Sequence, residues 1–296
     1  MNRLIYPTAV LFFLAIGLPT VQAAIIMGDR FDTYADQAAF QAAWPAIGTV
    51  APLSGDLSTA QAKSAPNSIE VDGTLTSNQQ RNQRIFAETG FPSATEKVVF
   101  SFDFYDTTPA GNPFRQNSSL QDTTAPSGTN QLISLGLSNN QLVANSGGNY
   151  YMARILGYNT DGPDADALAD PDPDGGPTES VSGAGLFFKL NDFGVGLRSL
   201  GWHNLKVAIS TDDGLSTDYQ FYVDGVLAEL VSNVGTAAQI RSYDTVRLGS
   251  GLSNASTAAY YDNMLVRRVP VPEPATFTLV GLGCAGIMLA GRRRVA

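Results

Sequence analysis

The clearest structural signal in the chain is the stretch Val98-Val99-Phe100-Ser101-Phe102-Asp103-Phe104-Tyr105. Its large apolar residues recur at every second position, which is the side-chain period of a β-strand with one buried face. Further strand-like runs are separated by Gly, Asn, Asp or Pro. They cover residues 68–71, 132–137, 150–158, 186–190, 205–209, 219–223, 245–248 and 260–266. This spacing predicts an all-β sandwich or barrel.

Two of the runs form a distinctive pair. Gly201-Trp202-His203-Asn204-Leu205-Lys206-Val207 is followed by Tyr219-Gln220-Phe221-Tyr222-Val223-Asp224-Gly225, in which Asp224-Gly225 suits a type I′ hairpin turn. With the opening stretch 29–44 and the closing run 260–266, the pair resembles the laminin-G-like and concanavalin A-like jelly rolls. The resemblance implies one jelly-roll β-sandwich domain over residues 24–269.

A single short helix is predicted near the start of this domain. Thr33 can act as its N-cap, and its small apolar residues recur at helical spacing before the chain reaches Trp44-Pro45. These residues are Ala35, Ala38, Ala39 and Ala42.

The amino terminus has the features of a secretory signal peptide. Arg3 precedes an apolar run over residues 9–18, and Val21-Gln22-Ala23 supplies small residues for signal peptidase. Residues 1–23 are therefore predicted to be a cleaved signal helix, with a mature chain that starts at Ala24.

The carboxyl terminus carries three elements in a fixed order: Val271-Pro272-Glu273-Pro274, an uncharged and mostly apolar stretch over residues 275–291, and Arg292-Arg293-Arg294. The middle stretch predicts a transmembrane helix of about 26 Å, with the arginines at its cytoplasmic end. Residues 270–296 resemble the PEP-CTERM sorting signal of Gram-negative bacteria that produce exopolysaccharide. The resemblance implies processing by an exosortase, a membrane-embedded transpeptidase, and thus transient anchoring in the inner membrane.

Charge and cysteine usage fit an exported protein. The formal net charge is −9, and it becomes about −13 if Arg3 and the three terminal arginines are removed. An acidic surface argues against nucleic acid or anionic lipid as a partner. The only cysteine, Cys284, lies in the predicted membrane span, so the exported part has no disulfide.

Two acidic sets are candidates for calcium, the one cofactor that the sequence suggests. Asp170, Asp172 and Asp174 precede Gly175 and match the first half of an EF-hand-like loop, although Val181 stands where the bidentate Glu is expected. A solvated acidic loop is the alternative interpretation. The jelly-roll resemblance implies a second, structural site formed by Asp29 or Asp32 with Asp262.

Catalytic patterns are sparse. His203 is the only histidine, and no nucleophile-elbow sequence accompanies it. Glu70 and Asp72 lie at alternate positions, as in jelly-roll glycosidases, but no further acidic residue follows them. The prediction is that the protein is not an enzyme.

Three tyrosines form a weak candidate for a sugar-binding platform: Tyr150, Tyr151 and Tyr158, with Arg154 beside them. The sequence thus predicts an exosortase-processed protein of the cell surface or extracellular matrix, with a non-catalytic domain. The alternatives are a lectin-like protein that binds exopolysaccharide and an enzyme that acts on polysaccharide.

Overall fold

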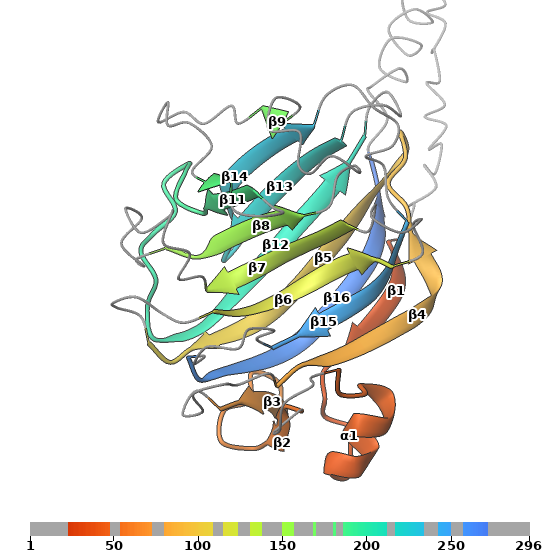
Figure 1. Ribbon diagram of the computed structural model, residues 1–296, viewed down its shortest axis with the longest axis vertical. Helices are drawn as coiled ribbons and strands as arrows, with labels where there is room; N and C mark the ends of the chain where they lie inside the picture. Colours follow the sequence, from red (N-terminus) through yellow and green to blue (C-terminus); the bar gives the residue numbers. More distant parts are fainter. Residues whose placement is uncertain are drawn as a thin grey trace, which may run out of the picture.

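Two antiparallel sheets face each other across an apolar core (Figure 1). The computed structural model describes residues 23–47, 54–72, 80–108, 115–123, 131–137, 150–156, 168–169, 180–181, 186–211, 217–233, 242–249 and 257–271. Within these residues the chain is nearly all β, with one helix, as the sequence predicts. The arrangement is consistent with a jelly-roll sandwich.

The nine-stranded sheet forms the back layer in Figure 1. In spatial order it contains β2 (Asp56–Ser58), β3 (Ser68–Val71), β16 (Ala259–Pro270), β5 (Glu96–Asp106), β12 (Gly201–Ser210), β13 (Thr217–Val223), β14 (Val226–Asn233) and β9 (Leu168–Ala169). The first strand, β1 (Ala24–Asp29), pairs with β16. Both ends of the described chain therefore lie in neighbouring strands.

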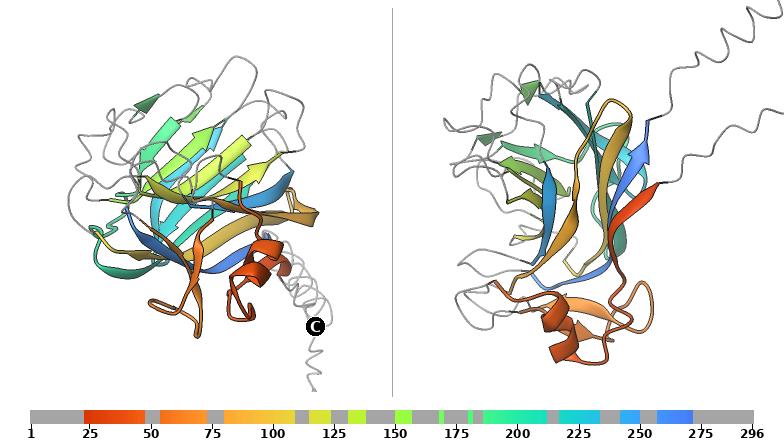
Figure 2. Two further views of the ribbon diagram at one scale, coloured as in Figure 1. Left: turned by 60° about the horizontal axis from the view of Figure 1, so that its bottom comes forward. Right: turned by 90° about the vertical axis from the view of Figure 1, so that its right-hand side faces the viewer.

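The seven-stranded sheet forms the front layer, and Figure 2 shows the two layers from the side. Its spatial order is β10 (Ser180–Val181), β11 (Leu186–Lys189), β8 (Met152–Leu156), β7 (Gln131–Leu137), β6 (Gln116–Asp122), β15 (Tyr243–Leu248) and β4 (Asn82–Gly90).

The core is built from alternate residues of both sheets. Phe100, Phe102 and Phe104 of β5 are fully buried, and they pack with apolar residues of β12, β13 and the facing sheet. Each such side chain contributes roughly 1.5–3 kcal/mol by leaving water. Because these positions face inward, the residues between them form the outer faces of the sandwich.

The β13–β14 turn has the predicted geometry. Asp224 and Gly225 both have positive φ, at 50° and 82°, as a type I′ turn requires. The tight turn fixes the register of the hairpin, in which Val223 lies opposite Val226.

The helix α1 (Gln37–Ala43) differs from its prediction in two respects. Its N-cap is Asp36, whose carboxylate accepts a hydrogen bond from Ala39 N, because residues 31–34 form a turn before the helix begins. Its buried face is formed by Phe40 and the C-cap residue Trp44, and three of the four predicted alanines, Ala35, Ala38 and Ala42, are exposed.

Among the residues that the structure describes, no helix is both long and apolar enough to cross a membrane. The predicted span at residues 275–291 and residues 1–22 of the predicted signal peptide lie outside the described part of the chain.

Candidate functional site: an arginine-lined face

The outer face of the seven-stranded sheet carries a row of residues, five of them polar or charged, that crosses six strands. The register places Arg247 opposite both Gln83 and Ser119, Ser119 opposite Ser134, and Arg154 opposite both Ser134 and Phe187. We call these residues the arginine row: Gln83, Arg247, Ser119, Ser134, Arg154 and Phe187. Five strand spacings make the row about 24 Å long.

Two further arginines lie next to the row. Arg115 lines a small hollow with Ser134, Arg154 and Phe187. The hollow has a volume of about 30 Å³, which is of the order of the volume of one water molecule. The guanidinium of Arg154 lies over the Phe187 ring, 4.9 Å from its centroid. Arg81 immediately precedes β4. Burial lowers the pKa of Arg247, the positive charge of Arg81 lowers it further, and the charge of Asp244 raises it.

Among the described residues, the four arginines outnumber the acids near them, since only Asp244 raises the pKa of Arg247. Burial is the main cause that lowers the pKa of Arg154, and the charge of Arg115 adds to it. In the described part of these strands the carboxylates have other partners: Glu88 pairs with Arg268, Asp122 with Ser242 N, and Asp244 with Thr123. The row thus holds half-buried guanidinium groups with excess positive charge.

Several hydrogen-bond donors on this face also lack acceptors. The Nε atoms of Arg81, Arg115 and Arg154 are buried without a hydrogen-bond partner. Arg247 Nε has only a long contact, 3.3 Å, with Gln83 Oε1. Buried donors without acceptors are costly, so the face is suited to a ligand that supplies anionic oxygens.

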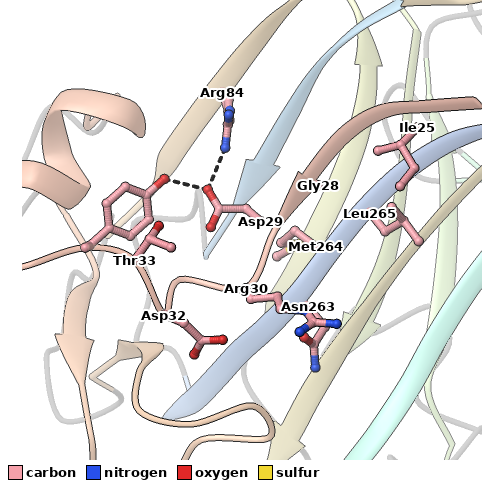
Figure 3. Close-up of a pocket in the computed structure, with 11 residues that line it drawn as sticks. Ile25, Gly28, Asp29, Arg30, Asp32, Thr33, Arg84, Asn263, Met264 and Leu265 are labelled. Atoms are coloured by element: carbon pink, nitrogen blue, oxygen red, sulfur yellow. Dashed lines mark hydrogen bonds and ion pairs between the residues drawn. The ribbon is translucent and has the colours of Figure 1, made fainter.

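The predicted calcium residues Asp29 and Asp32 line a pocket of about 860 Å³ between β1, β16 and the turn before α1 (Figure 3). The Asp29 carboxylate already accepts hydrogen bonds from Tyr34 Oη at 2.5 Å, Trp44 Nε1 at 2.8 Å and Arg84 at 2.5 Å. Asp32 Oδ1 is buried without a partner.

Asp262, the third predicted ligand, is bonded elsewhere. Its carboxylate accepts hydrogen bonds from Lys63 N and Ser64 N, both at 2.8 Å, and from Ser64 Oγ. Within the described ranges, no three acidic, histidine or cysteine side chains are grouped as a metal site. Calcium binding therefore stays a prediction. The other set, Asp170, Asp172 and Asp174, lies outside the described residues.

The tyrosine platform does not form as predicted. Tyr151 is only 3% exposed and donates a hydrogen bond to buried Asp106, because the residue before β8 points into the core. Tyr150 is half-buried, and Tyr158 lies outside the described residues. In the sorting motif, Val271 N donates to Thr95 O, whereas Pro272, Glu273, Pro274, Arg292, Arg293 and Arg294 lie outside the described residues.

The single histidine has two neighbours that sequence analysis did not identify. His203 Nδ1 lies 2.7 Å from Asp224 Oδ2, and Nε2 lies 3.1 Å from Ser199 Oγ. Nε2 is also 2.9 Å from the Ser199 carbonyl oxygen, which calls for a proton on Nε2. A general base needs an unprotonated Nε2 instead. These contacts favour a structural role in which His203 links the segment before β12 to the β13–β14 turn. We call this link the His203 clamp.

The arginine row was missed by sequence analysis, apart from Arg154. The available signal was the alternation of Arg115, Asn117, Ser119 and Gln121, all of which lie on one face of a strand. This alternation of polar residues becomes meaningful only once the strand is known.

Comparison with protein families finds the PEP-CTERM protein-sorting motif at residues 270–294. The motif implies an exported protein that an exosortase processes. No curated protein matches the chain.

Solved structures with a similar fold include three whose names describe enzymes that act on carbohydrates. A carbohydrate esterase from Shiga toxin-encoding bacteriophage phi24B has 11% identity and a TM-score of 0.47, over 83% of this chain and 99% of that one. An endo-1,3-beta-glucanase from Streptomyces sioyaensis has 15% identity and a TM-score of 0.47, over 85% and 98%. An alginate lyase has 10% identity and a TM-score of 0.45, over 83% and 98%.

The prediction that the protein is not an enzyme is contradicted by these neighbours, since esterase, glucanase and lyase structures recur among them. With TM-scores below 0.5, none of them assigns a reaction or a ligand to this chain.

Proposed function

We propose that this exported protein binds an acidic polysaccharide through the arginine row of a concanavalin A-like jelly-roll domain, at the cell surface or in the extracellular matrix. The observation that carries the proposal is the row itself. Arg154 and Arg247 lie on one face, and neither forms an ion pair with a carboxylate of the described residues.

The shape of the row favours an extended polymer over a small anion. Arg154 and Arg247 are separated by three strand spacings, or about 14 Å, with Ser119 and Ser134 between them. A single carboxylate cannot contact both guanidinium groups at that distance. A chain of uronic acids carries repeated carboxylates along its length, so successive carboxylates can reach the two guanidinium groups.

The chemistry of the arginines favours carboxylates or sulfates on that chain. Guanidinium groups form paired, charge-assisted hydrogen bonds with such groups. The acidic charge of the whole protein opposes non-specific binding of anions. The arginine row is locally positive, so anions are expected to bind there and not over the rest of the surface.

The test is binding of the purified protein to a polyuronate, with dextran as an uncharged reference, for the wild type and the Arg154→Ala/Arg247→Ala variant. We expect the variant to lose at least tenfold in polyuronate affinity. Arg267→Ala is the matched control, because Arg267 is a half-buried arginine on the outer face of the other sheet. Equal losses in the control and the double variant, or no loss in the double variant, would overturn the proposal.

The same incubations can be followed for new reducing ends and for unsaturated products. These readouts detect hydrolysis or elimination of the polysaccharide separately from its retention.

A further inference from the structure

The outer face of the nine-stranded sheet carries a second row, which differs in chemistry from the arginine row. The register places Trp202 opposite Tyr105, Tyr105 opposite Tyr260, Tyr260 opposite Glu70, and Glu70 opposite Asp56. We call these five residues the aromatic strip. It lies on the side of the sandwich opposite to the arginine row.

In the strip, the central ring of Tyr105 contacts the rings of Trp202 and Tyr260 on either side of it. Tyr105 lies edge-on to Trp202, with centroids 5.4 Å apart and an interplanar angle of 75°. It lies edge-on to Tyr260 as well, at 5.8 Å and 88°. All three side chains are only half-buried. Their contacts hold the rings in fixed orientations while leaving part of each ring exposed to a ligand.

The polar end of the strip contains hydrogen-bond acceptors. Tyr260 Oη donates to Glu70 Oε1 at 3.0 Å, which orients both groups. Asp56 lies directly across from Glu70 and is exposed. Partial desolvation of its carboxyl group raises the pKa of Asp56, and the charges of Glu70 and Asp72 raise it further. Like charges directly opposite each other destabilise a sheet, so the pair of Asp56 and Glu70 does not contribute to the stability of the fold.

These features define the ligand by complementarity. Carboxylates accept hydrogen bonds and repel anions, so the ligand must offer donors and carry no negative charge. Exposed aromatic rings favour a ligand with a flat apolar face. A neutral β-linked polysaccharide has both properties, because its pyranose rings present C–H groups on their faces and hydroxyl groups around their edges.

We infer that the aromatic strip is a binding site for a neutral β-linked polysaccharide. Trp202 and Tyr260 contact sugar rings, and Glu70 and Asp56 accept hydrogen bonds from hydroxyl groups. Two strand spacings separate Trp202 from Tyr260, about 9 to 10 Å, which is close to the repeat of two sugars in an extended β-linked chain. With an acidic polysaccharide on the other sheet, the protein would hold two different polymers at once.

Titration of the protein with hydroxyethyl cellulose, followed by tryptophan fluorescence, tests this inference. The chain has two tryptophans, and Trp44 is fully buried, so a change on binding reports Trp202. We expect a saturable change in the wild type, its loss in Trp202→Phe, and at least a tenfold weaker retention of Trp202→Ala/Tyr260→Ala in affinity gels that contain the polymer.

Tyr222→Ala is the matched control, because Tyr222 lies on the same outer face but contacts Lys206 instead of the strip. It should bind hydroxyethyl cellulose as the wild type does. The Arg154→Ala/Arg247→Ala variant should also keep this binding, so failure of the polyuronate site and failure of the aromatic strip are distinguishable. No binding by the wild type, or unchanged binding by the Trp202 and Tyr260 double variant, would overturn the inference.

Discussion

Arg198 and Asp106 form an ion pair in which both side chains are completely buried. Arg198 Nε lies 2.8 Å from Asp106 Oδ2, and a second guanidinium nitrogen lies 3.1 Å from Oδ1. Tyr151 donates its hydroxyl hydrogen bond to the same carboxylate. The pair joins the end of β5 to the segment that precedes β12, next to the His203 clamp.

Removing one member of this pair should be strongly destabilising. Arg198→Met leaves the Asp106 carboxylate buried without its counter-ion, and we expect a loss of about 3–5 kcal/mol in the free energy of unfolding. Equilibrium unfolding in urea measures this change in the free energy of unfolding. Arg268→Met is the control, because its partner Glu88 is exposed and such surface pairs contribute about 0–1 kcal/mol. Equal effects of the two substitutions would contradict the assignment.

Gly136 should not tolerate a side chain. Its φ is +146°, and a Cβ there would lie 2.2 Å from the Gln116 carbonyl oxygen. Backbone strain and overpacking together predict a loss of about 2 kcal/mol or more for Gly136→Ala. Thermal unfolding should show a lower Tm. Gly196→Ala, where nothing lies within 4 Å, should leave Tm nearly unchanged. A stable Gly136→Ala variant would show that β6 and β7 are less closely paired.

The Asp56→Asn variant should be more stable than the wild type at neutral pH. The pKa of Asp56 is raised in the folded state, so the folded protein binds more protons there than the unfolded chain does. Wild-type stability from this group therefore falls as pH rises above about 3.9, its ordinary value. The gain in Tm for Asp56→Asn should be present at pH 7 and vanish near pH 3. A gain in Tm that is the same at pH 3 and pH 7 would show that the raised pKa of Asp56 is not its cause.

Polyuronate binding should weaken with salt, whereas binding of hydroxyethyl cellulose should not. Raising NaCl from about 0.1 M to 1 M shortens the screening length from about 10 Å to about 3 Å. We expect at least a tenfold drop in polyuronate affinity over this range, measured by calorimetry. Parallel changes for both polymers would argue against two chemically distinct sites.

The sequence predicts the strands whose inward positions are apolar, such as β5, β12 and β13. It does not predict β6, because two of its inward residues are polar. Gln116 accepts a hydrogen bond from the buried Tyr261 hydroxyl, and Ser118 donates to the Arg247 carbonyl oxygen. Such partners come from distant parts of the chain, so local periodicity cannot reveal them.

The candidate sites depend on strand order even more strongly. Arg81, Arg115, Arg154 and Arg247 come from four separate stretches, and only the order β8-β7-β6-β15-β4 brings them to one face. The aromatic strip likewise combines Tyr260 near the end of the chain with Tyr105 and Trp202. Residue type can suggest the chemistry, but the pairing of strands determines which residues act together.

The strand that leads into the sorting motif is also one of the most extensively paired. β16 is hydrogen-bonded to β1, β3 and β5, and the sorting motif, here called the tail, starts at its last residue, Pro270. A force applied through the tail would run along the axis of β16 and load its ladders in shear, so that many hydrogen bonds resist together. The pairing of β16 on both sides is therefore suited to carry tension between the domain and its sorting motif.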